Sequence, residues 1–278
     1  MRRFSALLLC TLFVTAGCST IQKTTNTIFD TITYPLDFIL PNQSNVQKRE
    51  YDALLARSSI TVDGLLNEQA WLHAFWTRDF TQVVRQSLGE ETPLPGAEPI
   101  EVSVVHEKYR IIVAFRGREK LVSTPYTTTA EEDQPLWEGD SVGVLVDADR
   151  NETNVRAFYL NPFNVLTDLN LISVGADGDP GPWRANALWK GQEVRTGVNL
   201  KEVTDDETGE TWSEWTCEIA LPVKALSVDQ TEITADSVWH IQFVRTNVLE
   251  EGQPAEVTLW SPARLYFRPS TYGIMRFP

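Results

Sequence analysis

The chain has 278 residues, 42% of them hydrophobic and 10% aromatic, and its formal net charge at pH 7 is −14. This composition is typical of a globular protein, with enough residues for one large domain or two small ones. Lysine and arginine do not cluster along the sequence, so we expect no nucleic-acid partner, because phosphate backbones bind to basic surfaces. The acidic balance mainly implies solubility.

The first twenty residues have the pattern of a secretory signal. Arg2 and Arg3 precede an apolar run over residues 6–14, which is too short to span a bilayer. Small residues then lead to Cys18, an arrangement that resembles the bacterial lipobox, although Thr15 stands where that pattern prefers leucine. The resemblance implies that the signal is cleaved and that Cys18 is lipidated. An ordinary cleaved signal with a coincidental cysteine is the alternative.

We therefore predict three segments: a signal peptide at 1–17, a lipid-anchored tether at 18–58 and one folded domain at 59–278. The tether is rich in threonine, asparagine and glutamine, and a short helix is expected within 45–57. Ser19 follows the cysteine, which by its resemblance to lipoprotein sorting rules favours the outer membrane. The protein is then expected to face the periplasm or the cell surface.

The domain shows short apolar or alternating runs every 8–15 residues, rich in β-branched and aromatic residues. Turn sequences such as DADRNE and DDETGE separate them. This pattern predicts an all-β fold, a β-sandwich with one or two short helices near 67–76 and 223–226. The predicted strands are 100–106, 109–117, 140–148, 154–161, 164–172, 183–190, 212–221, 238–246 and 272–277.

The opening of the domain, SITVDGLLNEQAWLHAFW at 59–76, has a structural explanation. An Asp-Gly turn follows a short strand, and Asn67 can cap a helix whose apolar face includes Trp71 and Phe75. We expect these aromatic side chains to pack inward.

The same segment begins a series of motifs that resembles the family 9 carbohydrate-binding modules. ITVDGLLNEQAWLHA, PLWEGDSVGVLVD, FYLNPFNVLTD, WSEWTCEIALPVKAL and TLWSPARLYFRPSTYGIMRF occur in the order of that family, across essentially all of 59–278. The resemblance implies a β-sandwich of jelly-roll type and a protein that binds saccharides, often at the end of a glycan chain. Family members are usually attached to glycoside hydrolases, which implies a role in carbohydrate catabolism.

An aromatic pair clamps the sugar in binding members of the family. One ring corresponds to Trp137, in the motif around PLWEGDSV, and the other to Phe267, just before RPSTYG. Flat rings bury the C–H face of a pyranose at little entropic cost. The polar side chains that would fix the hydroxyl groups are Glu138, Asp140, Asn161, Arg245, Asn247 and Arg268.

Three positions depart from the family pattern. Phe267 stands where the second clamp residue is a tryptophan, Gly143 stands where binding members carry a glutamate, and Tyr159 stands where they carry an arginine. Each lost charged hydrogen bond is worth about 1.5–3 kcal/mol, so the changes weaken a sugar site. We therefore keep a second hypothesis, an envelope scaffold or interaction lipoprotein that has lost sugar binding and contacts a protein partner.

A metal or cofactor site is weakly indicated. Asp147, Asp149 and Asn151 resemble the start of a calcium loop, but the glycine and the final acid of that loop are missing. A hairpin turn of solvated acids explains them better, and a structural calcium stays open because some family members hold one. No other cofactor is expected.

Catalysis has no support in the sequence. Three histidines lie far apart, no hydrolase or nucleotide-binding motif occurs, and Cys217 has the setting of a small core residue. An enzyme, or a haem-binding sandwich of the cytochrome-like (DOMON-like) kind using Met275, is the third and weakest hypothesis.

Overall fold

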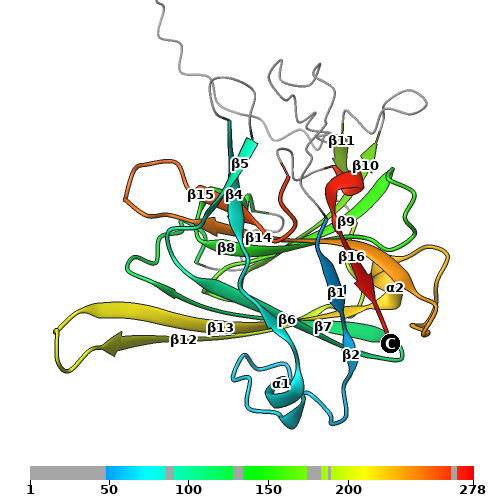
Figure 1. Ribbon diagram of the computed structural model, residues 1–278, viewed down its shortest axis with the longest axis horizontal. Coiled ribbons are helices and arrows are strands. Elements are labelled where there is room, and N and C mark those ends of the chain that lie inside the picture. The colour runs from blue at the N-terminus through cyan, green and yellow to red at the C-terminus, as the bar shows by residue number, and fades with distance from the viewer. Residues whose placement is uncertain (1–47, 86–90, 128–133, 174–182, 187–188, 264–267) are drawn as a thin grey trace, which may run out of the picture.

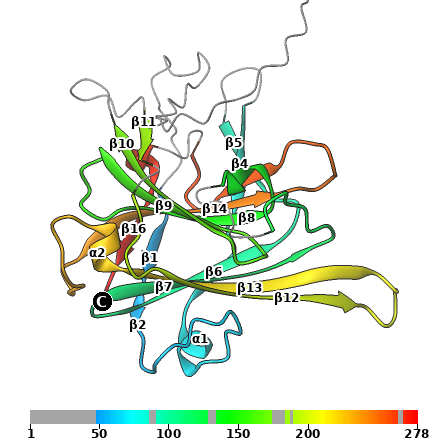
Figure 2. The same ribbon diagram turned by 180° about the vertical axis from the view of Figure 1, so that it is seen from behind.

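The computed structural model describes residues 48–85, 91–127, 134–173, 183–186, 189–263 and 268–278. Their strands form two sheets that lie face to face, so the fold is all-β and sandwich-like, as the sequence predicts (Figures 1 and 2). No helix among these residues is long and apolar enough to cross a membrane.

Sheet A has ten strands and sheet B has six. Sheet A runs in the order β11-β10-β9-β8-β14-β15-β4-β5, with β16 beside β14 and β1 beside β16. Its strands are β1 (Glu50–Asp52), β4 (Thr81–Arg85), β5 (Glu91–Pro95), β8 (Ser141–Asp147), β9 (Asn154–Leu160), β10 (Leu166–Ser173), β11 (Trp183–Asn186), β14 (Val238–Asn247), β15 (Glu256–Leu259) and β16 (Gly273–Arg276).

Sheet B runs in the order β12-β13-β7-β6-β2, with β3 also paired to β6. Its strands are β2 (Leu54–Leu55), β3 (Trp76–Thr77), β6 (Ile100–Glu107), β7 (Arg110–Glu119), β12 (Arg195–Thr204) and β13 (Thr211–Pro222). The short helices are α1 (Gln69–His73), α2 (Val223–Leu226), η2 (Leu136–Glu138) and η3 (Pro269–Thr271).

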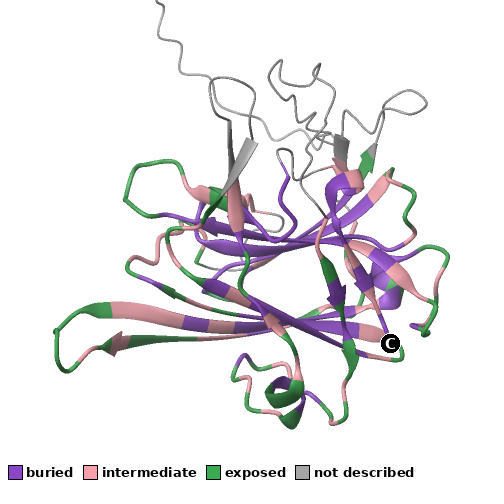
Figure 3. Ribbon diagram, in the orientation of Figure 1, coloured by how far each residue is buried: buried purple, intermediate pink, exposed green. Residues whose placement is uncertain are grey.

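The core lies between the sheets and follows from the alternation of side chains along each strand. In Figure 3 the buried residues are concentrated in the middle of both layers, whereas those at the end of the β12–β13 hairpin are exposed or intermediate. Each fully buried aliphatic or aromatic side chain contributes roughly 1.5–3 kcal/mol. The core includes Val142, Val144 and Val146 of β8, Phe243 of β14 and Trp215, Cys217, Ile219 and Leu221 of β13.

A second set of contacts attaches α1 to the outer face of sheet B. Trp71 is 4% exposed and belongs to a cluster with residues of β6, β7 and β13. Its indole Nε1 donates to Glu218 Oε1 at 2.8 Å, and the backbone N–H groups of Asp63 and Gly64 donate to Glu218 Oε2, both at 2.9 Å. Gly64 has a φ of +82°, and a Cβ there would lie 2.6 Å from the backbone of Val198. The Asp-Gly turn therefore needs its glycine.

The predicted strands are confirmed within a few residues where the structure describes them. A short helix was expected within 45–57, and the described part of that range, 48–57, contains none. Residues 50–52 and 54–55 are strands that pair with β16 and β6. Tyr51 is 2% exposed, and its hydroxyl accepts from the backbone N–H of Val104 at 2.9 Å. The sandwich thus includes residues that the sequence analysis placed in the tether, because Tyr51 gains a buried site between the sheet edges.

Two details of the opening motif also differ from expectation. The residue at the helix N-cap position is Glu68 and not Asn67, and its side chain accepts from the backbone N–H of Thr61 at 3.0 Å. Phe75 is 62% exposed because the chain turns into β3 after α1 ends at His73. The sequence analysis also missed β12, whose mixture of polar, charged and apolar residues lacks a strong apolar pattern.

Candidate functional site

Trp137 lies in η2, above the outer face of sheet A. Leu136, beside it in the same turn, is fully buried and holds the turn in place. The indole of Trp137 is only partly buried, and it meets the ring of Tyr159 edge-on, with centroids 5.5 Å apart and an interplanar angle of 65°. This contact supports the indole from below and leaves part of it accessible.

Tyr159 in turn depends on Gly143 in the neighbouring strand. The two residues are direct partners in the register of β8 and β9. A Cβ built on Gly143 would lie 2.8 Å from Cε1 of Tyr159, so the tyrosine ring occupies the space above the glycine. Two of the positions that depart from the family motif, Gly143 and Tyr159, are therefore in direct contact.

Tyr126 and Glu138 lie beside Trp137. The Tyr126 hydroxyl donates to Glu138 Oε2 at 2.9 Å, and the Glu138 side chain is exposed. Tyr126 packs against the same apolar cluster as Trp137, and its pKa is raised by burial and by the adjacent Glu138 carboxylate. Trp137, Tyr126 and Glu138 are hereafter called the Trp137 platform.

Asn161 holds this platform and does not face solvent. It is fully buried, its Nδ2 donates to the backbone carbonyl of Tyr126 at 2.5 Å, and its Oδ1 accepts from the N–H groups of Phe163 and Val165 at 3.0 Å. All of its polar atoms are used within the protein. As the chain is arranged here, Asn161 positions the segment that carries Tyr126.

Asp140 is also a structural residue in this arrangement. It is fully buried, and its carboxylate accepts from the backbone N–H of Val248 at 2.7 Å and from that of Ser123. Burial raises its pKa, while these hydrogen bonds act in the opposite direction. Asp140 thus joins three loops at one end of the sandwich and offers no oxygen to a ligand.

Arg245 and Asn247 lie inside that same end, between the two sheets. They are 3% and 1% exposed. The guanidinium of Arg245 pairs with Glu119, donates to Asn247 Oδ1 at 3.0 Å, and lies 5.3 Å from the ring centroid of Trp215. The structure therefore separates these residues from the Trp137 platform, which lies on the outer face.

Glu119 was not singled out in the sequence, yet it is the central acid of this buried group. It is 1% exposed and accepts from the Trp215 indole. Burial raises the pKa of Glu119 to about 7, although the charge of Arg245 lowers it. Sequence position alone gave no signal, because Glu119 ends β7 in the charged stretch at 116–119, which reads as solvent-exposed.

The C-terminal part of the predicted clamp is incompletely placed. Phe267 lies outside the described residues. Arg268 is partly exposed at the start of η3, where its backbone carbonyl accepts from the N–H of Thr271 at 2.9 Å and from its hydroxyl at 2.7 Å. Cys18 and the rest of the predicted signal also lie outside the described residues.

The acidic side chains at the turn after β8 accept hydrogen bonds from other groups of the protein. The Asp147 carboxylate accepts from the N–H groups of Asn151 and Glu152, both at 3.1 Å. Asp149 accepts from the Val228 N–H at 3.0 Å and from a serine hydroxyl, and Asn151 caps its own turn. Within the described ranges, no group of three or more His, Cys, Asp or Glu side chains is arranged to hold a metal ion.

The remaining reactive side chains are parts of the core. Cys217 is fully buried, as predicted, and burial raises the pKa of its thiol. Met275, considered above as a haem ligand, is fully buried in the main core, and His106 meets Phe277 edge-on at 5.3 Å. These contacts give each side chain a packing role.

No protein-family model and no curated protein sequence matches the chain. Solved structures do. A Bacteroides uniformis protein assigned as carbohydrate-binding has a TM-score of 0.59 at 14% identity, covering 84% of this chain and 100% of that one. A family 9 carbohydrate-binding module from Caldicellulosiruptor kristjanssonii, in complex with cellotriose, has a TM-score of 0.50 at 10% identity, covering 82% and 93%. The chain therefore has the fold that its motifs predict.

Gly143→Ala tests the contact between Gly143 and the Tyr159 ring. Alanine in a strand is ordinarily more stable than glycine. Here the added Cβ meets the Tyr159 ring, so we expect the free energy of unfolding to fall by about 1–3 kcal/mol. Adding Tyr159→Val removes the ring. The free energy of unfolding of the double variant, measured by urea denaturation, should then fall by less than the sum of the falls in the two single variants. Additive losses would show that the two residues do not share this space.

The raised pKa of Glu119 predicts a pH-dependent stability. The folded protein holds this proton up to a pH of about 7, whereas the reference value is 4.5. The contribution of Glu119 to the free energy of unfolding should therefore be largest below pH 4.5 and fall as the pH rises toward 7, by at most about 1.4 kcal/mol per pH unit. Denaturation of wild type and Glu119→Gln across pH 4–8 measures it. An unchanged slope in the variant would contradict the assignment.

Proposed function

We propose that this domain is a non-catalytic carbohydrate-binding domain that holds a neutral saccharide on the Trp137 platform. The observation that carries the proposal is the partly exposed indole of Trp137, fixed by a buried neighbour and by the Tyr159 ring beneath it. A pre-positioned flat ring can bury the C–H face of a pyranose without ordering a flexible side chain.

The polar groups beside the indole suit sugar hydroxyls. Glu138 accepts hydrogen bonds, and Tyr126 can donate or accept. Sugar sites commonly combine an aromatic surface with a few convergent polar groups. The similarity in fold to a module crystallised with cellotriose supports a β-linked glucan as the first ligand to test.

The second hypothesis, an envelope scaffold that has lost sugar binding, is favoured by one observation. The Tyr159 ring fills the space beside Gly143. The family resemblance gives charged residues at both positions, so this site has fewer hydrogen-bonding groups. A scaffold would use the outer face of sheet A to contact a protein. The two proposals differ in whether a saccharide binds at Trp137.

The domain is further proposed to act from a lipid anchor at Cys18, as an outer-membrane lipoprotein facing the periplasm or the surface. The N-terminal sequence pattern supports this placement. An anchored saccharide-binding domain would keep glycans close to the cell, which fits a role in carbohydrate catabolism.

Trp137→Ala tests saccharide binding. Cellotriose and cellohexaose titrated calorimetrically should bind the wild type, and the variant should bind at least roughly tenfold more weakly, which corresponds to about 1.4 kcal/mol of lost contact. Tyr109→Ala is the control, because Tyr109 is an aromatic residue that is 58% exposed at the turn between β6 and β7. Equal binding by the Trp137 variant and the wild type would reject the platform. Absence of heat across a panel of neutral glycans would favour the scaffold.

Cys18→Ser tests the anchor. In a bacterial host, the wild type should incorporate labelled palmitate and fractionate with membranes, and the variant should lose the label, because serine has no thiol for lipid attachment. Labelling that persists in Cys18→Ser would contradict the lipobox interpretation. Ser19→Asp then tests the predicted outer-membrane location by membrane fractionation, since the sorting rules predict that this variant is retained in the inner membrane.

A further inference from the structure

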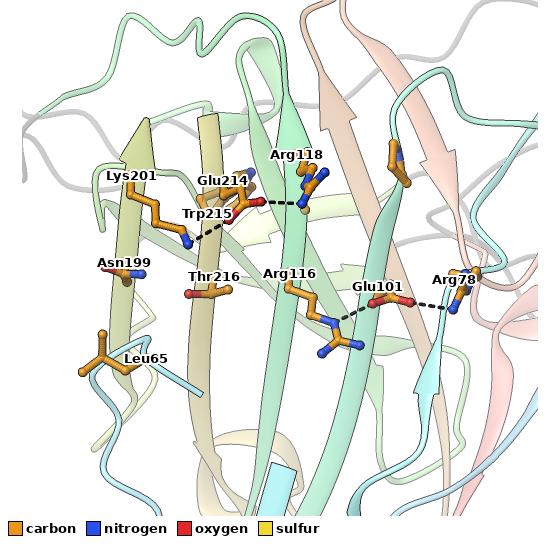
Figure 4. Close-up of a pocket in the computed structure, with 12 residues that line it drawn as sticks. Leu65, Arg78, Glu101, Arg116, Arg118, Asn199, Lys201, Glu214, Trp215 and Thr216 are labelled. Carbon is orange, nitrogen blue, oxygen red and sulfur yellow. Dashed lines mark hydrogen bonds and ion pairs between the residues drawn. The ribbon is translucent and has the colours of Figure 1, made fainter. Parts of the chain in front are cut away.

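A second surface, unrelated to the Trp137 platform, lies on the outer face of sheet B. It is a groove of about 430 Å³, within the range of about 300–1,000 Å³ typical of small-ligand sites. Leu65 and Pro99 lie among its lining residues, and its charged and polar side chains come from β6, β7, β12, β13 and the residue after β3 (Figure 4). We call it the sheet B groove.

The strand register builds the groove from two rows of outward-facing side chains. Asn199, Thr216, Arg116 and Glu101 are successive partners across four strands. Lys201, Glu214 and Arg118 form a second row. Each lies two residues from a member of the first row on the same strand, and therefore on the same face of the sheet. Neighbouring strands are about 4.8 Å apart, so each row presents its groups at a regular spacing.

The groove is rich in cations. Glu101 bridges Arg78 at 3.1 Å and Arg116 at 2.5 Å, while Glu214 bridges Arg118 at 2.7 Å and Lys201 at 2.8 Å. Figure 4 shows these two bridged groups side by side on the sheet. Four positive charges thus face two negative ones, on a chain whose net charge is −14. Each carboxylate is shared, which leaves guanidinium and ammonium N–H groups available to another anion.

Two of the three arginines in the groove stack on tryptophan rings. The guanidinium of Arg116 lies 4.0 Å from the ring centroid of Trp76, and that of Arg118 lies 4.9 Å from that of Trp212. Stacking of this kind fixes the plane of a guanidinium, and a planar, pre-oriented fork matches the geometry of a carboxylate. Arg116 and Arg118 are therefore partly pre-oriented, while their side chains stay accessible to a ligand.

Neutral polar groups share the first row. The amide of Asn199 and the hydroxyl of Thr216 lie among the groove residues, and the Thr216 hydroxyl donates to the backbone carbonyl of Gly64. A ligand with both carboxylates and hydroxyls would use both kinds of group. Repeating units that carry one carboxylate and several hydroxyls are the defining chemistry of uronic-acid glycans.

We propose that the sheet B groove binds an acidic glycan, a short chain of uronic-acid residues, with Arg116, Arg118 and Lys201 contacting its carboxylates. The proposal extends the proposed carbohydrate-binding function to a second site and a second class of saccharide. Because the groove and the Trp137 platform lie on the outer faces of opposite sheets, either site can fail without the other.

Other anionic partners fit less well. An acidic peptide gains affinity by adding a strand to a sheet edge, but the floor of the groove is β13 and β7, whose backbones are already paired on both sides. A long nucleic acid would meet the repulsion of a net charge of −14. A short oligosaccharide responds mainly to charges within a Debye length of about 8 Å, where the cations are in excess.

The second copy of this chain is the remaining alternative. The tip of the β12–β13 hairpin carries Asp205, Asp206, Glu207 and Glu210, and Figure 1 shows this hairpin extending beyond the rest of the sandwich. An acidic tip could enter the groove of a partner. The test therefore includes a measurement of self-association.

The experiment is a calorimetric titration of the full-length folded protein with tetragalacturonate, and with cellotetraose as a neutral chain of equal length, at 50 and 300 mM NaCl. The double variant Arg116→Gln/Arg118→Gln removes two groove cations. Arg110→Gln is the matched control, because Arg110 is on the same strand, pairs with Glu107 and lies outside the groove. Thermal unfolding confirms that each variant folds, and Lys201→Gln alone serves if the double variant does not.

We expect tetragalacturonate to bind the wild type at low salt. Its affinity should fall at least tenfold in the double variant and several-fold in Lys201→Gln. Arg110→Gln and Trp137→Ala should leave its affinity unchanged. No binding, or equal affinity for tetraglutamate, would overturn the proposal. A dimer that forms with increasing protein concentration and excludes tetragalacturonate would assign the groove to a second copy of the chain. That dimer should dissociate in the triple variant Asp205→Asn/Asp206→Asn/Glu207→Gln. Loss of cellotriose binding in Trp137→Ala, with tetragalacturonate binding kept, would separate the two sites.

Discussion

Burial of the two inner sheet faces against each other is the constraint on which the molecule depends. Side chains point to alternate faces along a strand. Because Trp215 and Cys217 are fixed in the core, their neighbours Glu214 and Thr216 must face outward. A shift of one residue would exchange the two sets and place charges in the interior. The large apolar contact between the sheets thus determines the outer surfaces on which both proposed binding sites lie.

The outer faces of the two sheets carry different kinds of side chain. On sheet A, the outer face carries an apolar cluster that includes Leu145, Tyr159 and Tyr272, and Trp137 packs against it at its margin. On sheet B, α1 covers part of the outer face, and the uncovered part carries bridged cations and acids. The first surface suits the C–H face of a sugar ring, and the second suits a charged ligand. One fold therefore offers two chemically distinct surfaces without any change in the core.

Much of the architecture could be predicted because its central strands are buried on both faces and stand out in the sequence as short apolar runs. β6, β7, β8 and β14 were recognised for this reason. Residues 50–55 were not, since only Tyr51 and Ala53 are buried there and so short a segment carries no detectable period. β12 was missed because it lies at the edge of sheet B, where a half-exposed strand needs little apolar sequence.

The candidate site was harder to predict, because facing and burial depend on tertiary contacts. Trp137 was found through its motif, but Arg245 and Asn247 lie on inward-facing positions that the motif does not reveal. The sheet B groove was invisible in the sequence because its cations come from separate strands and meet only through register. Lysine and arginine that do not cluster along the chain can still cluster on a sheet.

The account is tested most directly by which indole responds to a sugar. The chain has nine tryptophans, and each indole N–H gives its own signal in a ¹H–¹⁵N NMR spectrum. Addition of cellotriose should shift the Trp137 signal and leave those of the fully buried Trp215, Trp239 and Trp260 in place. A Trp137 signal that stays fixed while the indole signals of other tryptophans move would contradict it.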